Sequence, residues 1–426
     1  MTRGSALLGA ALGLFVLAAA AMHAVAALGP GHRAVPYIAL HGVMVAAMLV
    51  ARSGLRARPS PRALSLTLWA GLLARAVLLP VASFTTTDVG RYLWDGTLAL
   101  HGGDPYGVAP GAASLGWLRA VCPAPADHLG VVSCYPPIAQ GAFALAAFAG
   151  PGYAFLAWKA LCGVGSSVTA VLAHRALRDT PRAHDAALVS LAPWLVLEAG
   201  VGAHLDALVA PLVLGALLLA ERRRWTLSAL LLGTAAAMKL LPAVAVLVIA
   251  WAAPSRLRYG LLAALPGVLS VALAVALGMH PPGSLAMVAE HWEFGAPLYT
   301  ALYAALPLVP EAVRAGLTAG GLAGTAIAAL DGASLRRRVL DGLGVQLLVS
   351  PVLYPWYGLS LSGVFPLVGA RWPVWLLSAA PLSYEVIDGY QSAARWDPAL
   401  WPTVAVAVAW TAGIAHDLWA RRHGAR

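Results

Sequence analysis

The residues best suited to chemistry lie in a polar stretch that directly follows an apolar segment early in the chain. This stretch contains Asp88, Arg91, Tyr92 and Asp95. A carboxylate can serve as the general base that takes a proton from a hydroxyl group, and Asp88 suits that role. If the stretch is helical, Asp88, Arg91 and Asp95 share one face. The structural alternative is that Asp88 caps a short helix and pairs with Arg91.

A second polar group follows a later apolar segment, where His204 and Asp206 come shortly after Glu198. Asp206 could orient an acceptor or anchor His204, and the imidazole could contact phosphate or sugar hydroxyls. The alternative is a polar pair that satisfies itself at the mouth of a helix. A metal site has less support, because these residues meet no known ligand spacing.

Lysine use is unusual, because Lys159 and Lys239 are the only lysines among 28 basic residues and both lie inside apolar segments. A charge within a membrane helix costs roughly 2.5–3.5 kcal/mol on insertion, so it normally faces a cavity or a partner. Lys239 stands beside Pro242 and is the preferred contact for a phosphate. A structural ion pair or a side chain that reaches toward the interface is the alternative.

Two aromatic groups come next. His291 lies beside Trp292 in a loop that either packs at a membrane interface or stacks on a sugar. Tyr354, Trp356 and Tyr357 form either an aromatic belt or part of a substrate site. These are the last candidate residues that residue type alone suggests.

The elements that must position these side chains are apolar helices. Hydrophobic residues make up 60% of the chain, charged residues 11%, and the mean hydropathy is +0.77, far outside the soluble range. We therefore expect an all-α polytopic membrane protein, residues 1–426 forming one membrane domain of about twelve transmembrane helices. The apolar segments are residues 5–28, 35–51, 63–83, 138–150, 153–173, 184–199, 205–220, 226–251, 257–278, 311–330, 339–352, 359–370, 372–386 and 400–420.

Arginines cluster in the short gaps between these segments, which is typical of cytoplasmic loops that face anionic lipid. This placement accounts for the net charge of +10, and no soluble basic patch favours nucleic acid. The clustered arginines are Arg52, Arg56, Arg58, Arg62, Arg175, Arg178, Arg182, Arg222, Arg223, Arg224, Arg256, Arg258, Arg336, Arg337, Arg338, Arg421, Arg422 and Arg426.

With these loops inside, residues 84–137 form a long first extracytoplasmic loop with short interfacial helices, and residues 279–298 form a second. Residues 138–173 conflict with this topology, since two full spans there would place Arg178 outside. Either the break at Gly150 makes 138–150 re-entrant, or the charge rule fails here. Segment 226–251 is expected to be broken, as in helices that line a polar cavity.

The motifs resemble those of bacterial GT-C glycosyltransferases, most closely the polyprenol-phosphate-mannose-dependent mannosyltransferases. The motifs are Asp88-Val-Gly-Arg91-Tyr92-Leu-Trp94-Asp95-Gly96, Gly103-Asp104-Pro105-Tyr106, Tyr135-Pro136-Pro137 with Gln140, and Ser350-Pro351-Val-Leu-Tyr354-Pro355-Trp356-Tyr357. The resemblance implies a GT-C-like bundle in the bacterial inner membrane. It implies inverting transfer from a polyprenyl-phosphate sugar, with Asp88 as catalytic base. We expect Tyr92, Asp95 and Tyr106 to bind the substrates, and Arg91 to steady the phosphate with Lys239 and His204.

Two departures from the family pattern limit how much detail carries over. Asp104 stands where the family usually has asparagine, and Cys134 precedes Tyr-Pro-Pro in place of a hydroxyl or aliphatic residue. The adjacent acidic pair of some GT-C branches is absent, so we expect no metal cofactor. The expected partners are a polyprenyl-phosphate sugar, a glycan, glycolipid or protein acceptor, and the bilayer.

Three questions stay open at the level of sequence. A disulfide between Cys122 and Cys134 is one possibility if their loop faces an oxidising compartment. A transporter or flippase of a lipid-linked substrate is the alternative function, although no related halves are visible. A non-catalytic membrane scaffold is a further alternative, and it would tolerate loss of the Asp88 carboxylate.

Overall fold

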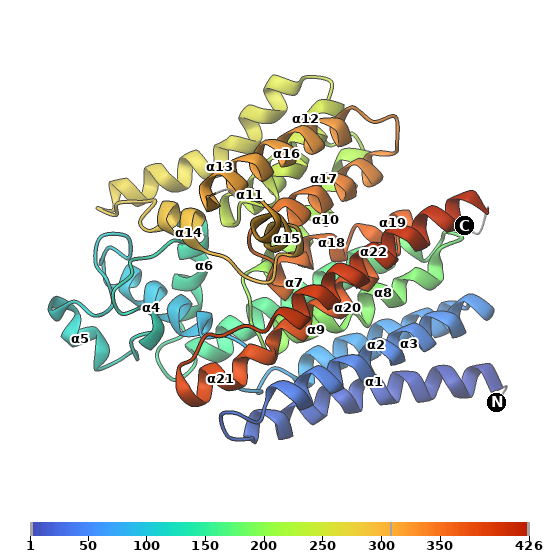
Figure 1. Ribbon diagram of the computed structural model, residues 1–426, viewed down its shortest axis with the longest axis horizontal. Helices are drawn as coiled ribbons and strands as arrows, with labels where there is room; N and C mark the ends of the chain where they lie inside the picture. Colours follow the sequence, from blue (N-terminus) through green and yellow to red (C-terminus); the bar gives the residue numbers. More distant parts are fainter. Residues whose placement is uncertain (1–2, 307–308, 424–426) are drawn as a thin grey trace.

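The computed structural model describes residues 3–306 and 309–423, and this part of the chain is almost entirely helical (Figure 1). Within it, the one β-type contact is an isolated parallel bridge between Phe294 and Val352. The predicted all-α class is confirmed. The described residues contain five helices that are long and apolar enough to cross a membrane, which indicates a membrane protein.

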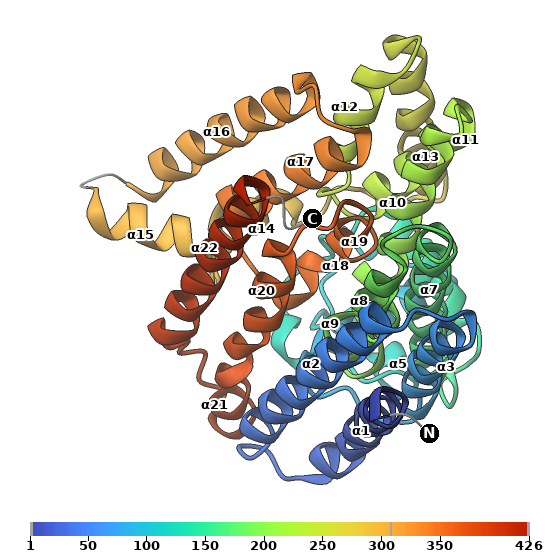
Figure 2. The same cartoon turned by 90° about the vertical axis from the view of Figure 1, so that its right-hand side faces the viewer.

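The first three helices lie side by side along the lower edge of Figures 1 and 2: α1 (Arg3–Ala27), α2 (Ala34–Ala57) and α3 (Pro61–Val77). Ser60 begins α3, because its side chain accepts a hydrogen bond from the Ala63 amide at 3.1 Å. Pro61 takes the first helical position, where a missing N–H costs nothing. The turn between α2 and α3 is therefore set by local sequence.

The polar loop after α3 contains the short helices that the sequence predicts. These are α4 (Asp88–Leu100), η1 (Ala113–Leu115), α5 (Gly116–Arg119) and η2 (Ala126–His128). They lie at the left-hand end of Figure 1, opposite the two termini.

The conflict over residues 138–173 is clarified by helix length. Helix α6 (Pro137–Ala147) has 11 residues, and Gly150, with φ of 83°, separates it from the 24 residues of α7 (Ala154–Leu177). At 1.5 Å per residue, α6 is roughly 16 Å long, about half a bilayer core. Arg182 then lies beside the same cavity as Arg52, so these arginine loops share one end of the bundle. This arrangement agrees with the re-entrant alternative.

The middle of the chain is broken into shorter pieces. They are η3 (Ala183–Ala186), α8 (Ala187–Ser190), α9 (Pro193–Gly200), α10 (Asp206–Glu221), α11 (Trp225–Met238), α12 (Ala243–Ala252) and α13 (Arg256–Ala276). The break expected in segment 226–251 is confirmed, because α11 ends at Met238 and α12 begins at Ala243, with Lys239 extended between them. Segment 184–199, predicted as one span, is interrupted before Pro193 instead.

The remaining elements are also of mixed length. They are α14 (Leu285–His291), α15 (Pro297–Ala305), α16 (Pro310–Leu330), α17 (Leu335–Val349), η4 (Pro355–Gly358), α18 (Leu359–Ser362), α19 (Phe365–Val368), α20 (Trp372–Ala379), η5 (Ala380–Glu385), α21 (Val386–Ala393) and α22 (Leu400–Arg422). The segments 359–370 and 372–386, each predicted as one span, are thus divided into short helices by glycine and proline residues. The count of about twelve spans is not confirmed.

Two buried cations inside the bundle serve the fold. Arg75, for which the sequence offers no role, donates to the Ser166 hydroxyl at 2.7 Å and to the Ser190 carbonyl at 2.8 Å. Lys159 donates to the carbonyls of Leu78 and Val81 just beyond α3. Each cation therefore satisfies backbone or hydroxyl oxygens where a helix is interrupted, as buried polar groups require.

Candidate active site

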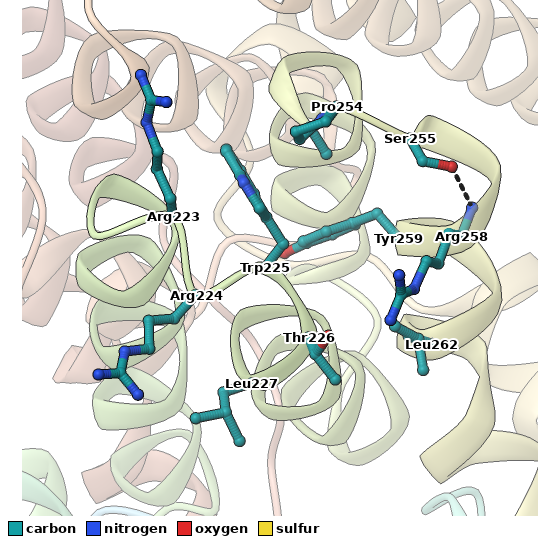
Figure 3. A pocket seen from close by; sticks show the side chains of 11 residues that line it. Arg223, Arg224, Trp225, Thr226, Leu227, Pro254, Ser255, Arg258, Tyr259 and Leu262 are labelled. Carbon is teal, nitrogen blue, oxygen red and sulfur yellow. Dashed lines mark hydrogen bonds between the residues drawn. The ribbon is translucent and has the colours of Figure 1, made fainter.

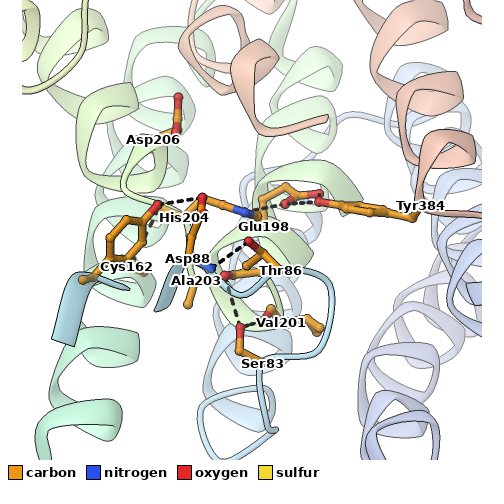
Figure 4. Close-up of polar contacts among 12 residues, drawn as sticks. Ser83, Thr86, Asp88, Cys162, Glu198, Val201, Ala203, His204, Asp206 and Tyr384 are labelled. Carbon is orange, nitrogen blue, oxygen red and sulfur yellow. Dashed lines mark hydrogen bonds and ion pairs between the residues drawn. The ribbon is translucent and has the colours of Figure 1, made fainter. Parts of the chain in front are cut away.

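Asp88 is the first residue of α4 and is half-buried. Its backbone amide donates to the Thr86 hydroxyl at 3.1 Å, and its carboxylate accepts from the Tyr92 hydroxyl at 3.3 Å (Figure 4). No ion pair to Asp88 occurs among the described residues. The alternative in which Asp88 pairs with Arg91 is therefore wrong, and the carboxylate keeps acceptor capacity for another group.

Arg91 pairs instead with Asp95, one turn further along α4, at 2.8 Å, and both side chains are buried. The Arg91 guanidinium also donates to the Val131 carbonyl at 2.5 Å. Gln140 of α6 donates to Asp95 at 3.3 Å and to Ser133 at 2.7 Å. Burial raises the pKa of Asp95, against the opposing effect of Arg91. This network binds the returning loop to α4, so it supports the site from behind.

Aromatic side chains pack under the same face of α4. Tyr92 stacks on Phe143 with ring centres 4.5 Å apart and meets Tyr135 edge-on at 5.1 Å. Tyr106 donates to the Tyr135 carbonyl at 2.8 Å, and burial raises the pKa of its hydroxyl. Trp158 of α7 packs against Tyr92 at 5.1 Å. Tyr106 therefore shapes the loop, while Tyr92 reaches Asp88.

The loop before α10 brings a second acidic group to this region. The His204 ring contacts Glu198 at 2.8 Å, and the Tyr384 hydroxyl donates to both Glu198 oxygens at 2.8 Å (Figure 4). Gly202 is needed here, because an added Cβ would lie 2.4 Å from the His204 ring. Ala203 adopts a left-handed φ of 51°, a strained conformation that is typical of functional loops. The sharp turn places the imidazole in the interior.

The Asp88 segment is tied directly to this loop. Ser83, in the connection between α3 and α4, donates to the Val201 carbonyl at 2.5 Å (Figure 4). Trp158 donates to the Ala203 carbonyl at 2.7 Å from the other side. Residues more than a hundred positions apart in sequence are therefore held in one place by hydrogen bonds to backbone.

Lys239 enters the site from the break between α11 and α12. Its ammonium group pairs with Asp206 at 2.6 Å and lies 4.6 Å from the centre of the Tyr357 ring. The Lys239 side chain is 22% exposed and that of Asp206 only 4%. The pair is therefore anchored on the buried side and keeps part of the cation accessible to a ligand.

The aromatic residues of the last polar loop cover the same group. Trp356 stacks on the His204 ring at 3.7 Å and on Tyr354 at 4.3 Å. Trp292 donates to the Tyr354 hydroxyl at 3.0 Å, and Phe294 stacks on the Tyr354 ring at 4.5 Å. The result is a continuous aromatic surface that leads from His204 to the loop before α15.

The sequence-predicted residues therefore fall into two sets. Those that the structure brings into direct contact are Asp88 with Tyr92, Lys239 with Asp206 and Tyr357, and Trp356 with His204 and Tyr354. Asp88, Asp206 and Lys239 also act electrostatically on His204. Arg91, Asp95 and Tyr106 lie behind this cluster as supports. His291 is exposed and contacts the carbonyl of Met287 in its own helix, so it is not brought to the cluster.

A comparison with known families bears directly on this cluster. The family model described as alpha-(1->6)-mannopyranosyltransferase, N-terminal domain, of the MptA/B family matches residues 2–255, more than half of the 426 residues. The chain belongs to this family. No curated protein and no solved structure matches it. Membership in a mannosyltransferase family confirms the predicted class of enzyme, a glycosyltransferase that handles mannose.

Within this MptA/B-family chain, the matched part contains most of the polar cluster. Asp88, His204, Asp206 and Lys239 lie inside residues 2–255, whereas the aromatic loop around Trp356 lies beyond them. The cluster is thus assembled from the matched N-terminal part and a cover that the C-terminal part supplies.

Tyr384 is the residue that sequence reasoning missed. It donates to Glu198 and packs edge-on against Tyr37 at 5.3 Å. Its signal was a phenol in a segment that otherwise looks like a membrane span, next to the more conspicuous charge of Glu385. An aromatic with a polar tip inside an apolar segment normally has a buried partner, and that partner identifies it.

The three cysteines and the possible metal ligands are also candidates from the sequence. Cys122, Cys134 and Cys162 are free in the structure, so the disulfide considered for the first loop is not formed. Burial raises the pKa of the Cys134 thiol to about 11, which keeps it protonated and unreactive near neutral pH. Among the described residues, no three His, Cys, Asp or Glu side chains gather closely enough to hold a metal ion.

Proposed function

We propose that this chain transfers mannose from a polyprenyl-phosphate donor to a hydroxyl group of a glycan, glycolipid or protein acceptor. The observation that carries the proposal is the Asp88 carboxylate, which is half-buried and has no ion pair within residues 3–306 and 309–423, in a cluster that also contains a lysine and stacked aromatics. Membership in a mannosyltransferase family supports the sugar and the reaction class. The lipid-linked donor follows from the resemblance and from the apolar helices around the site.

Asp88 acts as the general base of an inverting displacement. Its carboxylate takes the proton of the acceptor hydroxyl as that oxygen bonds to the anomeric carbon. The bond between the anomeric carbon and the phosphate oxygen breaks on the opposite face, and the polyprenyl phosphate leaves with both bonding electrons. Tyr92 donates to the same carboxylate at 3.3 Å and fixes its orientation.

Lys239 stabilises the departing phosphate. Negative charge grows on that group in the transition state, and a cation that is already in position lowers the barrier without reorganisation. Asp206 holds Lys239 at 2.6 Å and the Tyr357 ring lies beneath it, so the ammonium group is fixed in advance. His204 lies within the electrostatic field of Asp88, Asp206 and Lys239 and supplies a further contact to phosphate or sugar.

The aromatic surface provides binding energy away from the reacting atoms. Tyr354 and Trp356 stack at 4.3 Å and extend toward Trp292. Sugar rings and polyprenyl chains both pack on such faces, and this holds the anomeric carbon in line for attack. We place the site on the extracytoplasmic side of the bacterial inner membrane, since the arginine-rich loops gather at the opposite end.

The test compares two substitutions of the same kind in one loop. Purified Asp88→Asn should lose about 10³-fold of the transfer from polyprenyl-phosphate mannose, because an amide cannot take the proton. Asp104→Asn is the matched control, since the described hydrogen-bond partners of the Asp104 side chain are the Tyr106 amide and His280, and Asp104 stands where related enzymes carry asparagine. It should stay within about threefold of the parent.

Two results would contradict the proposal. Full activity of Asp88→Asn would show that Asp88 is not the general base. The parent enzyme is also assayed with both donors. If it transferred mannose from a nucleotide-linked donor and not from the lipid-linked donor, the proposed donor class would be wrong, and the family membership would be unaffected.

A further inference from the structure

The end of the bundle opposite α4 contains a large cavity that the transfer reaction does not use. Its volume is about 1750 Å³, and Figure 2 looks onto this end of the molecule. The cavity is lined by α2, the loop after α7, the end of α10, the start of α17, and the α19–α20 and α22 segments. We call it the arginine cavity. Seven arginines line it against five carboxylates: Arg52, Arg56, Arg182, Arg336, Arg337, Arg371 and Arg421 against Asp185, Glu221, Asp331, Asp341 and Asp417.

Several of these charges neutralise one another. Arg336 pairs with Glu221 at 2.6 Å, and Arg337 pairs with Asp341 at 2.6 Å. Asp417 is occupied differently, because its carboxylate accepts from the backbone amide of Arg371 at 2.8 Å at the start of α20. The arginines that remain are Arg52, Arg182 and Arg371 in the partly buried part of the cavity and the exposed Arg56 and Arg421.

Asp185 is the most deeply buried of these five carboxylates, with a side chain that is 1% exposed. Arg52 donates to it at 2.7 Å, and Arg371 approaches the same oxygen at 3.5 Å. A single carboxylate thus faces two guanidinium groups. Arg182 lies near Arg371 in the same cavity and forms no ion pair among the described residues.

Two guanidinium nitrogens here are buried with nothing to donate to. They are Nη2 of Arg52 and Nη1 of Arg182, neither of which has a hydrogen-bond partner within the part of the chain that the structure describes. Gly369, with φ of 70°, makes room for the Arg182 group, since an added Cβ would lie 1.7 Å from Nη1. A buried, unpartnered N–H of a charged group is costly, and such groups normally have a hydrogen-bond partner in protein, water or a bound ligand.

A smaller cavity at the turns between α10 and α11 and between α12 and α13 shows the contrast (Figure 3). Its volume is about 370 Å³, and Arg223, Arg224 and Arg258 line it with Trp225 and Tyr259. Its arginines are exposed, so water satisfies them. The tendency of arginine to gather on one side of a membrane explains that cavity, but it does not explain buried donors without acceptors.

We propose that the arginine cavity binds a phosphate-bearing anion through Arg52 and Arg182. Guanidinium groups match phosphate oxygens in charge and in geometry, and the two unpartnered nitrogens supply the donors. The phosphate belongs either to the headgroup of an anionic lipid or to a soluble molecule. The site is separate from the Asp88 cluster and does not depend on its chemistry.

The experiment uses the full chain purified in a phosphate-free detergent buffer. One arm titrates inorganic phosphate and follows the melting temperature. The other adds phosphatidylglycerol and counts retained lipid molecules by native mass spectrometry. A response to phosphatidylglycerol alone assigns a lipid headgroup, a response to phosphate alone assigns a soluble ligand, and competition between them shows one shared site. No response in either arm overturns the proposal.

Two arginine substitutions locate the site. Arg182→Gln should weaken binding of the responding ligand by about tenfold, the effect of one charge-assisted hydrogen bond. Arg178→Gln is the matched control, because Arg178 is exposed, lies outside the cavity and pairs with Asp179 at 3.1 Å. If Arg182→Gln does not fold, Arg56→Gln at the cavity rim replaces it, with an expected loss of about threefold. Equal losses in the cavity variant and the control would overturn the assignment.

Discussion

The two ends of this bundle place their charges in opposite ways. At the α4 end, buried carboxylates, one lysine and stacked aromatic rings converge from distant segments, as with Asp88, His204, Lys239 and Trp356. At the other end, arginines from many short turns surround a cavity and outnumber the carboxylates there. The first arrangement fixes a few groups in defined positions. The second supplies a positive surface in which only some members are fixed.

The difference follows from how each charge is satisfied. At the α4 end, Lys239 has Asp206 and the Tyr357 ring as neighbours, and Glu198 has Tyr384 and His204. Preorganised groups of this kind are what catalysis requires. At the arginine end, Arg336 and Arg337 form partly exposed ion pairs, which contribute little to stability.

The contrast between the two ends is tested most strongly by the buried Arg91–Asp95 ion pair at the α4 end. Asp95→Ala should destabilise the protein by about 3–5 kcal/mol, because it leaves Arg91 charged and buried without its partner. The double variant Arg91→Met and Asp95→Leu should recover much of this loss. The measurement is thermal unfolding in detergent. If Asp95→Ala has the same melting temperature as the parent, the ion pair does not stabilise the loop against α4.

Lys239→Met should lower kcat/KM for the lipid-linked donor by about 10–100-fold, the usual contribution of hydrogen bonds to a charged group. Lys239→Arg retains the charge and should recover a large part of the activity. Steady-state kinetics with varied donor concentration gives the result. Equal losses in both variants would assign Lys239 to packing alone.

Glu198→Gln should reduce stability by about 1–3 kcal/mol, since the amide nitrogen would face the Tyr384 hydroxyl or the His204 ring in place of an acceptor. Glu385→Gln is the control, because Glu385 accepts only the Ala399 amide at 2.8 Å. The measurement is the melting temperature of each variant compared with that of the parent. A larger loss in the control would contradict the network.

Accessibility to a membrane-impermeant maleimide tests whether the two ends face opposite sides. In a background without native cysteines, Asp104→Cys should label in intact cells about tenfold more than Arg178→Cys. Permeabilised cells should label both equally. Equal labelling in intact cells would place the α4 end and the arginine end on one side, and the proposed location of the site would fail.

The sequence determined the class of protein and the types of residue involved. Apolar segments define the helices because an apolar face must be buried or lie in lipid, and Pro242 beside Lys239 marks the broken helix from local chemistry alone. The choice of Asp88 also came from sequence, through its position after a span and the motif around it.

Only the tertiary structure decided which polar groups meet. Arg91 was a candidate partner of Asp88 and of substrate, but it is turned toward Asp95 and the returning loop. Lys239 is paired with Asp206, and Tyr384 holds Glu198 from a segment 186 residues away. Spacing along one helix predicts neighbours on that helix, whereas contacts between helices depend on how the whole bundle packs. For the same reason hydropathy predicted one span at residues 359–370, where the structure has short helices, because hydropathy measures burial but does not distinguish protein interior from lipid.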